Sequence, residues 1–176
     1  EAPSGQATLA LRIPAWADAA DLKVNGEPAG VEVVPGSYAR ITREWQTGDA
    51  VSLDLPMRVR RLRSHPRVLD NRGHVALARG PVVYCVEEAD HAGVDVYDLG
   101  LAPDAAIASH HKGDLLGGVT VLEAEGVELN SKASNLYQEQ PFAAPGATGS
   151  TPLKAIPYFV WANRGAGKMR VWIPEA

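Results

Sequence analysis

The chain has 176 residues, 45% of them hydrophobic, and its 17 basic against 21 acidic side chains give a net charge of −4. A chain of this length and composition can bury one large core or two small ones, which excludes a disordered tail. The small negative charge and the scatter of basic residues argue against nucleic acid as a partner. No apolar run approaches the roughly 18 residues that a membrane span needs, so no membrane partner is expected.

The first residue and the single cysteine indicate which context, disulfides and metal sites to expect for the chain. It begins at Glu1 without a signal-peptide pattern, so we expect a soluble piece of a longer protein. Its single cysteine, Cys85, excludes an internal disulfide and a cysteine-cluster metal site. We expect no metal and no cofactor in this chain. The compartment stays open, with an intracellular location favoured.

The first 60 residues alternate between apolar and polar side chains as strands do. Residues 8–13 place Leu9, Leu11 and Ile13 on one face, which predicts a half-buried strand that ends at Pro14. Asn25-Gly26 lies between two short apolar runs, and both residue types tolerate the positive φ of a tight turn, so a hairpin is predicted there.

A second hairpin is predicted from the alternating segments 37–45 and 50–57, which flank the turn residues Gly48-Asp49. Residues 58–63, RVRRLR, also alternate. Two interpretations fit this basic strand: a solvated edge strand protected by its charge, which we favour, and a strand at an interface.

The rest of the chain reads as further strands with one long interruption. Gly80-Pro81 breaks the β-rich segment 73–88 and marks a kink, an edge or a crossover. Residues 126–152 are rich in Gly, Pro, Ser and Asn and predict a long loop. The fold class is therefore all-β, of the β-sandwich type and jelly-roll-like. Further strands are predicted at 94–101, 119–125, 153–162 and 168–173.

Cys85 in the segment VVYCVEE is either a nucleophile or a packed apolar residue. The alternation of a strand places Glu87 on its face and turns Glu88 away. A nucleophilic thiol needs a lowered pKa from a cation, a metal or a helix N-terminus, whereas valines surround this one. We therefore favour a structural cysteine over a cysteine-dependent hydrolase. No catalytic residue is assigned.

Other polar residues give weaker signals. The adjacent His110 and His111 diverge in a strand or a helix, so they do not chelate one metal together. A pair of carboxylates is what glycoside hydrolysis requires, but the sequence does not show which of them meet. The candidates are Glu87, Glu88, Asp90 and Asp95.

Aromatic residues gather near the C-terminus and suggest a carbohydrate-binding face. Rings beside amide and guanidinium groups are the components of such a face. The spacing of Phe159 and Trp161 also fits a buried terminal hairpin, and we favour a core or interface location for these rings over a sugar-binding face. The candidate sugar-binding residues are Tyr158, Trp161, Asn163, Arg164 and Trp172.

Five segments together resemble the C-terminal part of glycoside hydrolase family 127, the β-L-arabinofuranosidase-like enzymes. They occur in the family's order and span most of the chain. The segments are LRIPAWA (11–17), VNGE (24–27), ITREWQTGDAVSLDLPM (41–57), HPRVLDNRGHVALARGPVVYCVEEAD (65–90) and AIPYFVWANRGAGKMRVWIP (155–174).

The resemblance implies a division of labour within a longer parent protein. In that family an (α/α)6 barrel carries catalysis, with a zinc-bound cysteine as nucleophile of a retaining mechanism, and two β-sandwich domains follow. Residues 1–60 then correspond to the end of the middle sandwich, which would be incomplete, and residues 61–176 to the whole C-terminal sandwich.

These implications give the expected function. We expect a non-catalytic accessory region that packs on and stabilises the barrel, with zinc confined to the barrel, and that aids a homodimer through an exposed sheet edge. The parent's sugar is left open. The alternatives are a carbohydrate-binding module that uses Tyr158, Trp161 and Trp172, and a hydrolase that uses Cys85.

Overall fold

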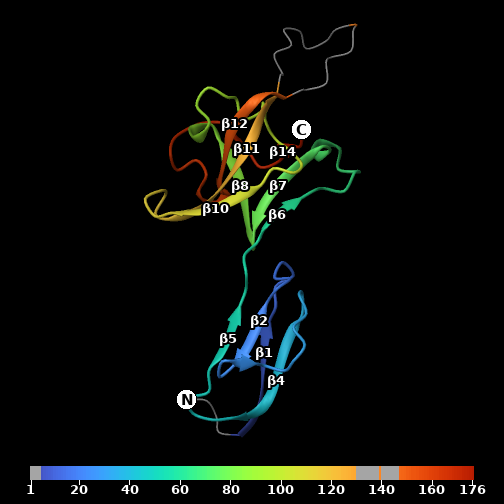
Figure 1. Ribbon diagram of the computed structural model, residues 1–176, viewed down its shortest axis with the longest axis vertical. Coiled ribbons are helices and arrows are strands. Elements are labelled where there is room, and N and C mark those ends of the chain that lie inside the picture. Colours follow the sequence, from blue (N-terminus) through green and yellow to red (C-terminus); the bar gives the residue numbers. More distant parts are fainter. Residues whose placement is uncertain (1–4, 130–138, 140–146) are drawn as a thin grey trace. The chain divides into compact units, whose positions relative to one another are not determined.

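The structure is a computed structural model that describes residues 5–129, 139 and 147–176 (Figure 1). In this part of the chain nearly every regular element is a strand, and three short 3-10 helices are the remainder. No helix among the described residues is long and apolar enough to cross a membrane. The chain divides into two compact units, Glu1–Arg58 and Val59–Ala176.

The first unit contains two small sheets that face a shared core. One sheet pairs β1 with β4, and the other has the order β3-β2-β5. Six apolar side chains between them are buried while ten more are only half-buried, so this core is thin. The strands are β1 (Gly5–Arg12), β2 (Asp21–Val24), β3 (Glu27–Pro28), β4 (Tyr38–Trp45) and β5 (Val51–Asp54).

The predicted turn at Asn25-Gly26 is confirmed. Asn25 has φ 53° and Gly26 has φ 85°, the left-handed pair that a two-residue hairpin needs. The turn joins β2 to β3, in which Val24 pairs with Glu27.

The predicted hairpin between residues 37–45 and 50–57 is wrong, although both strands exist. β4 pairs along its whole length with β1, and β5 pairs with β2. Hydrogen bonds at the Gly48-Asp49 turn explain why the chain passes from one sheet to the other between β4 and β5. Asp49 accepts from the Asn25 side-chain amide at 2.7 Å, and the Asn25 backbone N–H donates to Ala50 O at 2.8 Å. The turn is thereby attached to the β2–β3 turn, which directs β5 into the other sheet.

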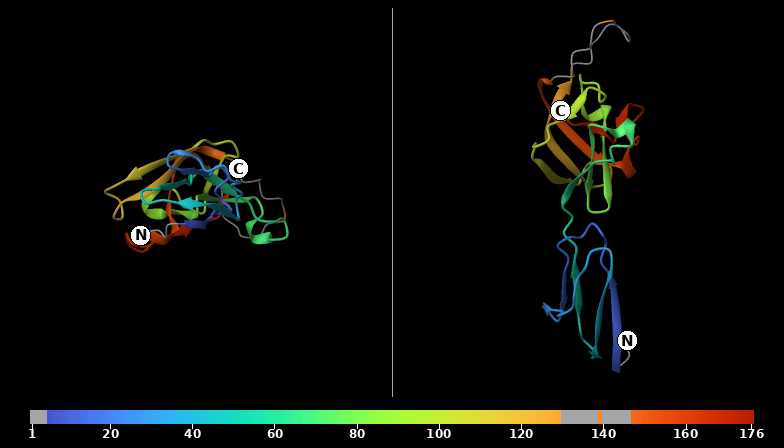
Figure 2. Two further views of the ribbon diagram at one scale, coloured as in Figure 1. Left: turned by 90° about the horizontal axis from the view of Figure 1, so that it is seen from below. Right: turned by 90° about the vertical axis from the view of Figure 1, so that its right-hand side faces the viewer.

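The second unit is built on one curled nine-stranded sheet whose main order is β10-β11-β12-β8-β7-β14. Figure 1 shows β7, β8, β11 and β12 at its centre, and Figure 2 shows its curvature from two further directions. The strands are β6 (Val59–Leu62), β7 (His74–Arg79), β8 (Val82–Glu87), β9 (Leu99–Leu101), β10 (Ile107–Lys112), β11 (Val119–Leu129), β12 (Ala147–Pro157), β13 (Met169–Arg170) and β14 (Ile173–Pro174). The 3-10 helices are η1 (Leu69–Asn71), η2 (Glu88–Asp90) and η3 (Tyr158–Val160).

Two apolar clusters pack on opposite faces of β8. Tyr84 and Val86 belong to the larger cluster, which also contains residues of β7, β9, β11, β12 and β14. Cys85 belongs to the smaller one, with Val121 and Ile156. β8 is therefore buried on both faces and organises the unit. The predicted all-β, sandwich-type fold class is confirmed.

The expectation of a solvated basic strand at residues 58–63 is wrong for its central arginines. All four residues of β6 are half-buried. Arg61 donates to Ala102 O at 2.9 Å and Ala105 O at 2.6 Å, and Arg60 donates to Gly80 O at 2.7 Å. The guanidinium groups thus supply hydrogen bonds to backbone carbonyls, which need partners when they are removed from water.

Several predicted boundaries change. The strands β11 and β12 extend to Leu129 and from Ala147, so strand replaces the loop expected at 126–129 and 147–152. The remaining positions of that loop, 130–138 and 140–146, lie outside the described residues. Gly80-Pro81 is the turn of the antiparallel hairpin β7–β8.

Gly126 on β11 marks a close approach between strands. A Cβ placed there would lie 3.0 Å from Leu153 Cβ and 3.1 Å from Gly100 O. We therefore expect Gly126→Ala to reduce the free energy of unfolding by about 1–3 kcal/mol through overpacking. Gly149→Ala on β12 is the control, because among the described residues no atom beyond its own chain neighbours lies within 4 Å of its Cβ position. Urea unfolding of both variants measures the difference, and equal stability would contradict this packing.

Candidate functional site

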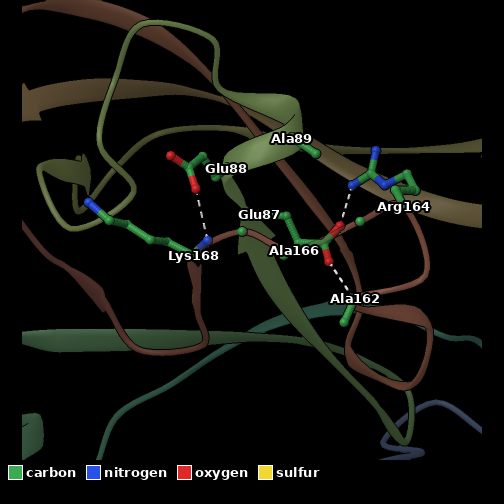
Figure 3. A pocket seen from close by; sticks show the side chains of 9 residues that line it. Glu87, Glu88, Ala89, Ala162, Arg164, Ala166 and Lys168 are labelled. Atoms are coloured by element: carbon green, nitrogen blue, oxygen red, sulfur yellow. Dashed lines mark hydrogen bonds and ion pairs between the residues drawn. The ribbon is translucent and has the colours of Figure 1, made fainter.

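Three charged side chains meet where β8 ends: Glu87, Asp90 and Arg164. Figure 3 shows Glu87 facing Arg164. Arg164 Nη1 donates to Asp90 Oδ1 at 2.8 Å, and Nη2 bonds both carboxylates. The side chains of Glu87 and Asp90 are only 8% and 6% exposed. We call these three residues the Arg164 clamp.

Neighbouring groups donate further hydrogen bonds to both carboxylates of the clamp, whereas the buried Nε of Arg164 has no partner among the described residues. Glu87 Oε1 accepts from the Ala162 N–H at 2.7 Å, and Asp90 Oδ1 accepts from Lys154 Nζ at 2.9 Å. Two carboxylates are thus balanced by two cations, as buried charges require.

His91 is buried beside the clamp and links it to β12. Its Nε2 accepts from the Lys154 backbone N–H at 3.1 Å, so Nδ1 carries the proton and donates to Glu87 O at 2.7 Å. The imidazole is therefore neutral in this arrangement.

Local sequence explains how the clamp forms. Glu87 is the last residue of β8, and the short helix η2 then turns the chain so that Asp90 lies beside it. Arg164 comes from the loop after η3. Because an unpaired charge inside a protein is costly, these carboxylates draw that loop onto the end of β8.

The electrostatics of the clamp keep Asp90 and Arg164 charged. Burial alone would raise the pKa of Asp90, but hydrogen bonds from Arg164 and Lys154 outweigh it and hold that pKa below the ordinary value. The hydrogen bond to Asp90 in turn raises the pKa of Arg164.

A small pocket of about 150 Å³ adjoins the clamp. At its rim Glu88 Oε2 accepts from the Lys168 backbone N–H at 2.9 Å, while the Lys168 side chain extends away from Glu87 (Figure 3). The carboxylates of Glu87 and Glu88 are thus both engaged by donors. Such pairing suits a structural ion cluster, whereas a general acid and base need proton-transfer partners in reach.

Asp90 gives the chain a pH-dependent stability. Its lowered folded pKa contributes stability above the ordinary value of 3.8, and this contribution is lost as the pH falls below 3.8 through the folded pKa. We expect Asp90→Asn to cost about 2–4 kcal/mol at pH 7 and to flatten the acid limb of stability against pH. Urea unfolding between pH 2 and pH 7 measures it. The exposed Asp70→Asn is the control, and an acid limb unchanged by Asp90→Asn would contradict the assignment.

Cys85 is fully buried on β8, packed with Val119, Val121 and Ile156. Burial, followed by the charge of Glu87, raises the pKa of Cys85 from 9.0 to about 12. Both properties oppose a nucleophilic role, which needs an accessible thiolate.

Thiol chemistry tests this environment. At neutral pH we expect iodoacetamide to alkylate the folded chain at least about a thousand-fold more slowly than the urea-unfolded chain, because the raised pKa depletes the thiolate. Mass spectrometry of timed samples measures both rates. Fast alkylation of the folded chain would contradict a buried thiol.

The aromatic residues around η3 are exposed. Tyr158 and Trp161 stack with centroids 6.2 Å apart and an interplanar angle of 27°. Their exposed fractions are 44% and 38%, and that of Phe159 is 70%. A core location is therefore wrong for these rings, because the chain leaves β12 at Pro157 and forms a 3-10 helix. An interface location stays a prediction.

The other predicted sugar-binding residues are not placed as free polar partners. Asn163 Nδ2 donates to Val160 O at 3.0 Å, and Arg164 points inward to the clamp. Trp172 is half-buried in the bend between β13 and β14. The structure thus brings Tyr158 and Trp161 together, and whether any of the five residues binds sugar stays a prediction.

The sequence reasoning missed the clamp. Acidic residues directly after an apolar strand were a usable signal, because a charge at the end of a buried strand needs a partner, but spacing does not reveal a partner far along the chain.

His110 lies on β10, 3.7 Å from Glu123 Oε2. Within the described residues no group of three or more His, Cys, Asp or Glu side chains is arranged to hold a metal ion.

Comparison with known families assigns both units. Residues 59–174 match the glycoside hydrolase family 127 C-terminal domain, and residues 1–57 match the beta-L-arabinofuranosidase, GH127 middle domain. Fold and domain order thus define a β-sandwich region of a glycoside hydrolase. The chain belongs to glycoside hydrolase family 127, which confirms the resemblance in the sequence.

Individual relatives agree with this assignment. The non-reducing end beta-L-arabinofuranosidase of Bifidobacterium longum subsp. longum is 37% identical over 172 residues, covering 92% of this chain and 25% of the relative. The crystal structure of a GH127 beta-L-arabinofuranosidase from Geobacillus stearothermophilus T6 has a TM-score of 0.86 at 41% identity, covering 98% of this chain and 27% of that one. A solved glycoside hydrolase has a TM-score of 0.88 at 32% identity, covering 98% and 28%. The chain thus spans about a quarter of the length of these relatives.

Proposed function

We propose that this chain is a non-catalytic accessory region of a retaining β-L-arabinofuranosidase-like enzyme and that it packs on and stabilises a catalytic (α/α)6 barrel. The observation that carries the proposal is the match of its two units to the middle and C-terminal domains of family 127. Relatives named beta-L-arabinofuranosidases support the activity of the parent protein.

The state of the polar groups supports a non-catalytic role. The Cys85 thiol is buried and its pKa is raised. The carboxylates of Glu87 and Asp90 are held by Arg164 and Lys154, which leaves them poorly suited to proton transfer. The zinc and the nucleophile of the parent then belong to its barrel, and this chain contributes structure.

The thin core and the small β1–β4 sheet of the first unit support a role in packing against further protein. The first unit has a thin core, and its sheet β1–β4 has only two strands in the described residues. Free strand edges pair readily with further strands, so this sheet is also the route by which we propose that the region aids a homodimer.

A carbohydrate-binding module is the second candidate. The exposed, stacked rings of Tyr158 and Trp161 favour it. Asn163 and Arg164 weaken it, because their donors are used within the chain and a sugar needs polar partners as well as rings.

The stabilising role is tested in the full-length polypeptide. If the sandwich supports the barrel, the destabilising Gly126→Ala should lower the temperature of heat inactivation by about 2–12 °C, since a loss of about 1–3 kcal/mol is expected and each kcal/mol corresponds to about 2–4 °C. Residual hydrolysis of an aryl β-L-arabinofuranoside after heating reports on the barrel, and Gly149→Ala is the matched control. The 176-residue chain alone should not hydrolyse this substrate.

Two results would reject parts of this proposal. If Gly126→Ala leaves the temperature of heat inactivation unchanged, the proposal that this region stabilises the barrel is rejected. Hydrolysis by the chain alone, abolished by Cys85→Ala, would replace the accessory role with a cysteine-dependent hydrolase.

A further inference from the structure

We infer that the side chains of Tyr158, Phe159 and Trp161, here called the η3 surface, dock on the catalytic barrel of the same polypeptide. This inference rests on the proposed function, which supplies the barrel. It adds the residues that make the contact and the groups that hold them in place.

The η3 surface is held in position at a conformational cost. Ala162, directly after Trp161, has φ 61°, a left-handed conformation that residues with a side chain rarely adopt. Its N–H donates to the buried Glu87 carboxylate at 2.7 Å, and Arg164 is bonded to Glu87 and Asp90. The Arg164 clamp thus fixes the segment that carries the rings, and a preorganised segment loses less entropy when it binds.

The exposed chemistry is that of a dry protein contact. Phe159 is 70% exposed and has no polar atom in its side chain. Clustered aromatic rings that a folded chain leaves exposed are typical anchors of protein interfaces. Buried against a partner, such rings would contribute most of the contact energy.

The same features disfavour a sugar as the occupant. Tyr158 and Trp161 stack on each other with their centroids 6.2 Å apart, so each ring covers part of one face of its neighbour. The side-chain amide of Asn163 donates to Val160 O and the guanidinium of Arg164 is engaged by two carboxylates. Sugar hydroxyls would therefore find few free donors beside the rings.

The length of the relatives points to the same polypeptide as the partner. This chain covers 25% of the Bifidobacterium relative and 27% of the Geobacillus structure, so most of each relative is additional protein. A surface within the same polypeptide is present at high effective concentration, which favours it over a second copy.

Hydroxyl-radical footprinting measures side-chain exposure and tests the contact directly. In the 176-residue chain, Phe159 and Trp161 should oxidise readily because they are exposed. In the full-length polypeptide both should oxidise about ten-fold more slowly, as expected for a surface that is docked in most molecules. Mass spectrometry of the peptides that contain them gives the rates.

Paired variants of the full-length polypeptide test whether the η3 surface itself makes the contact. Phe159→Ser should restore the oxidation of Trp161 by about ten-fold, because it removes an anchor of the interface. Leu69→Ser on η1 is the matched control, since Leu69 is 67% exposed. It should leave the protection of Trp161 unchanged.

Three results would overturn the inference. Equal oxidation in both proteins would show a free η3 surface, and the heat-inactivation experiment would still decide the accessory role separately. Protection that disappears on dilution would assign the surface to a second copy. Protection that requires added L-arabinose or an arabinose oligosaccharide would assign it to a sugar.

Discussion

The ion pairs of Arg164 with Glu87 and Asp90 connect two segments of the second unit that lie far apart in the sequence, the end of β8 and the loop after η3. Glu87 ends a strand whose last four residues are buried, and its own side chain is only 8% exposed. Because a buried carboxylate without a cation is costly, the loop that carries Arg164 has to close over the end of β8. The position of the aromatic side chains then follows from that of the loop.

Cys85 and the clamp lie next to each other and obey the same constraint. Both belong to a segment from which water is excluded, and exclusion of water has opposite consequences for the two groups. The thiol stays protonated because burial raises its pKa more than the charge of Arg164 lowers it. Asp90 stays ionised because hydrogen bonds from Arg164 and Lys154 outweigh burial. Burial alone therefore does not predict the protonation state of a group.

Structure that depends on neighbouring residues could be predicted from this sequence, whereas the pairing of strands far apart in the chain could not. Asn25-Gly26 fixed a turn because only a few residue types accept its backbone angles. The separation of β4 and β5 into different sheets could not be predicted, because it depends on contacts between Asp49 and Asn25 across the unit. The exposure of Phe159 was missed because alternation does not reveal that a strand ends before the ring.

The same reasoning applies to the candidate site. The buried, structural state of Cys85 followed from its valine neighbours and the alternation of the strand. Predicting the Arg164 clamp would have required knowing the partner of Glu87, and no rule of sequence spacing connects Glu87 to Arg164. Sequence periodicity describes the environment along one element, whereas an ion pair joins two elements whose meeting depends on the whole fold.

The pairing of β1 with β4 and of β2 with β5 has a consequence for folding kinetics. Gly5 pairs with Trp45 and Asp21 pairs with Asp54, so most ladders of the first unit join segments distant in the chain. Such a unit cannot fold by closing consecutive hairpins, and high contact order makes folding slow. During synthesis the β1–β4 ladder can form only after β4 has left the ribosome, while the β2–β3 turn can form earlier.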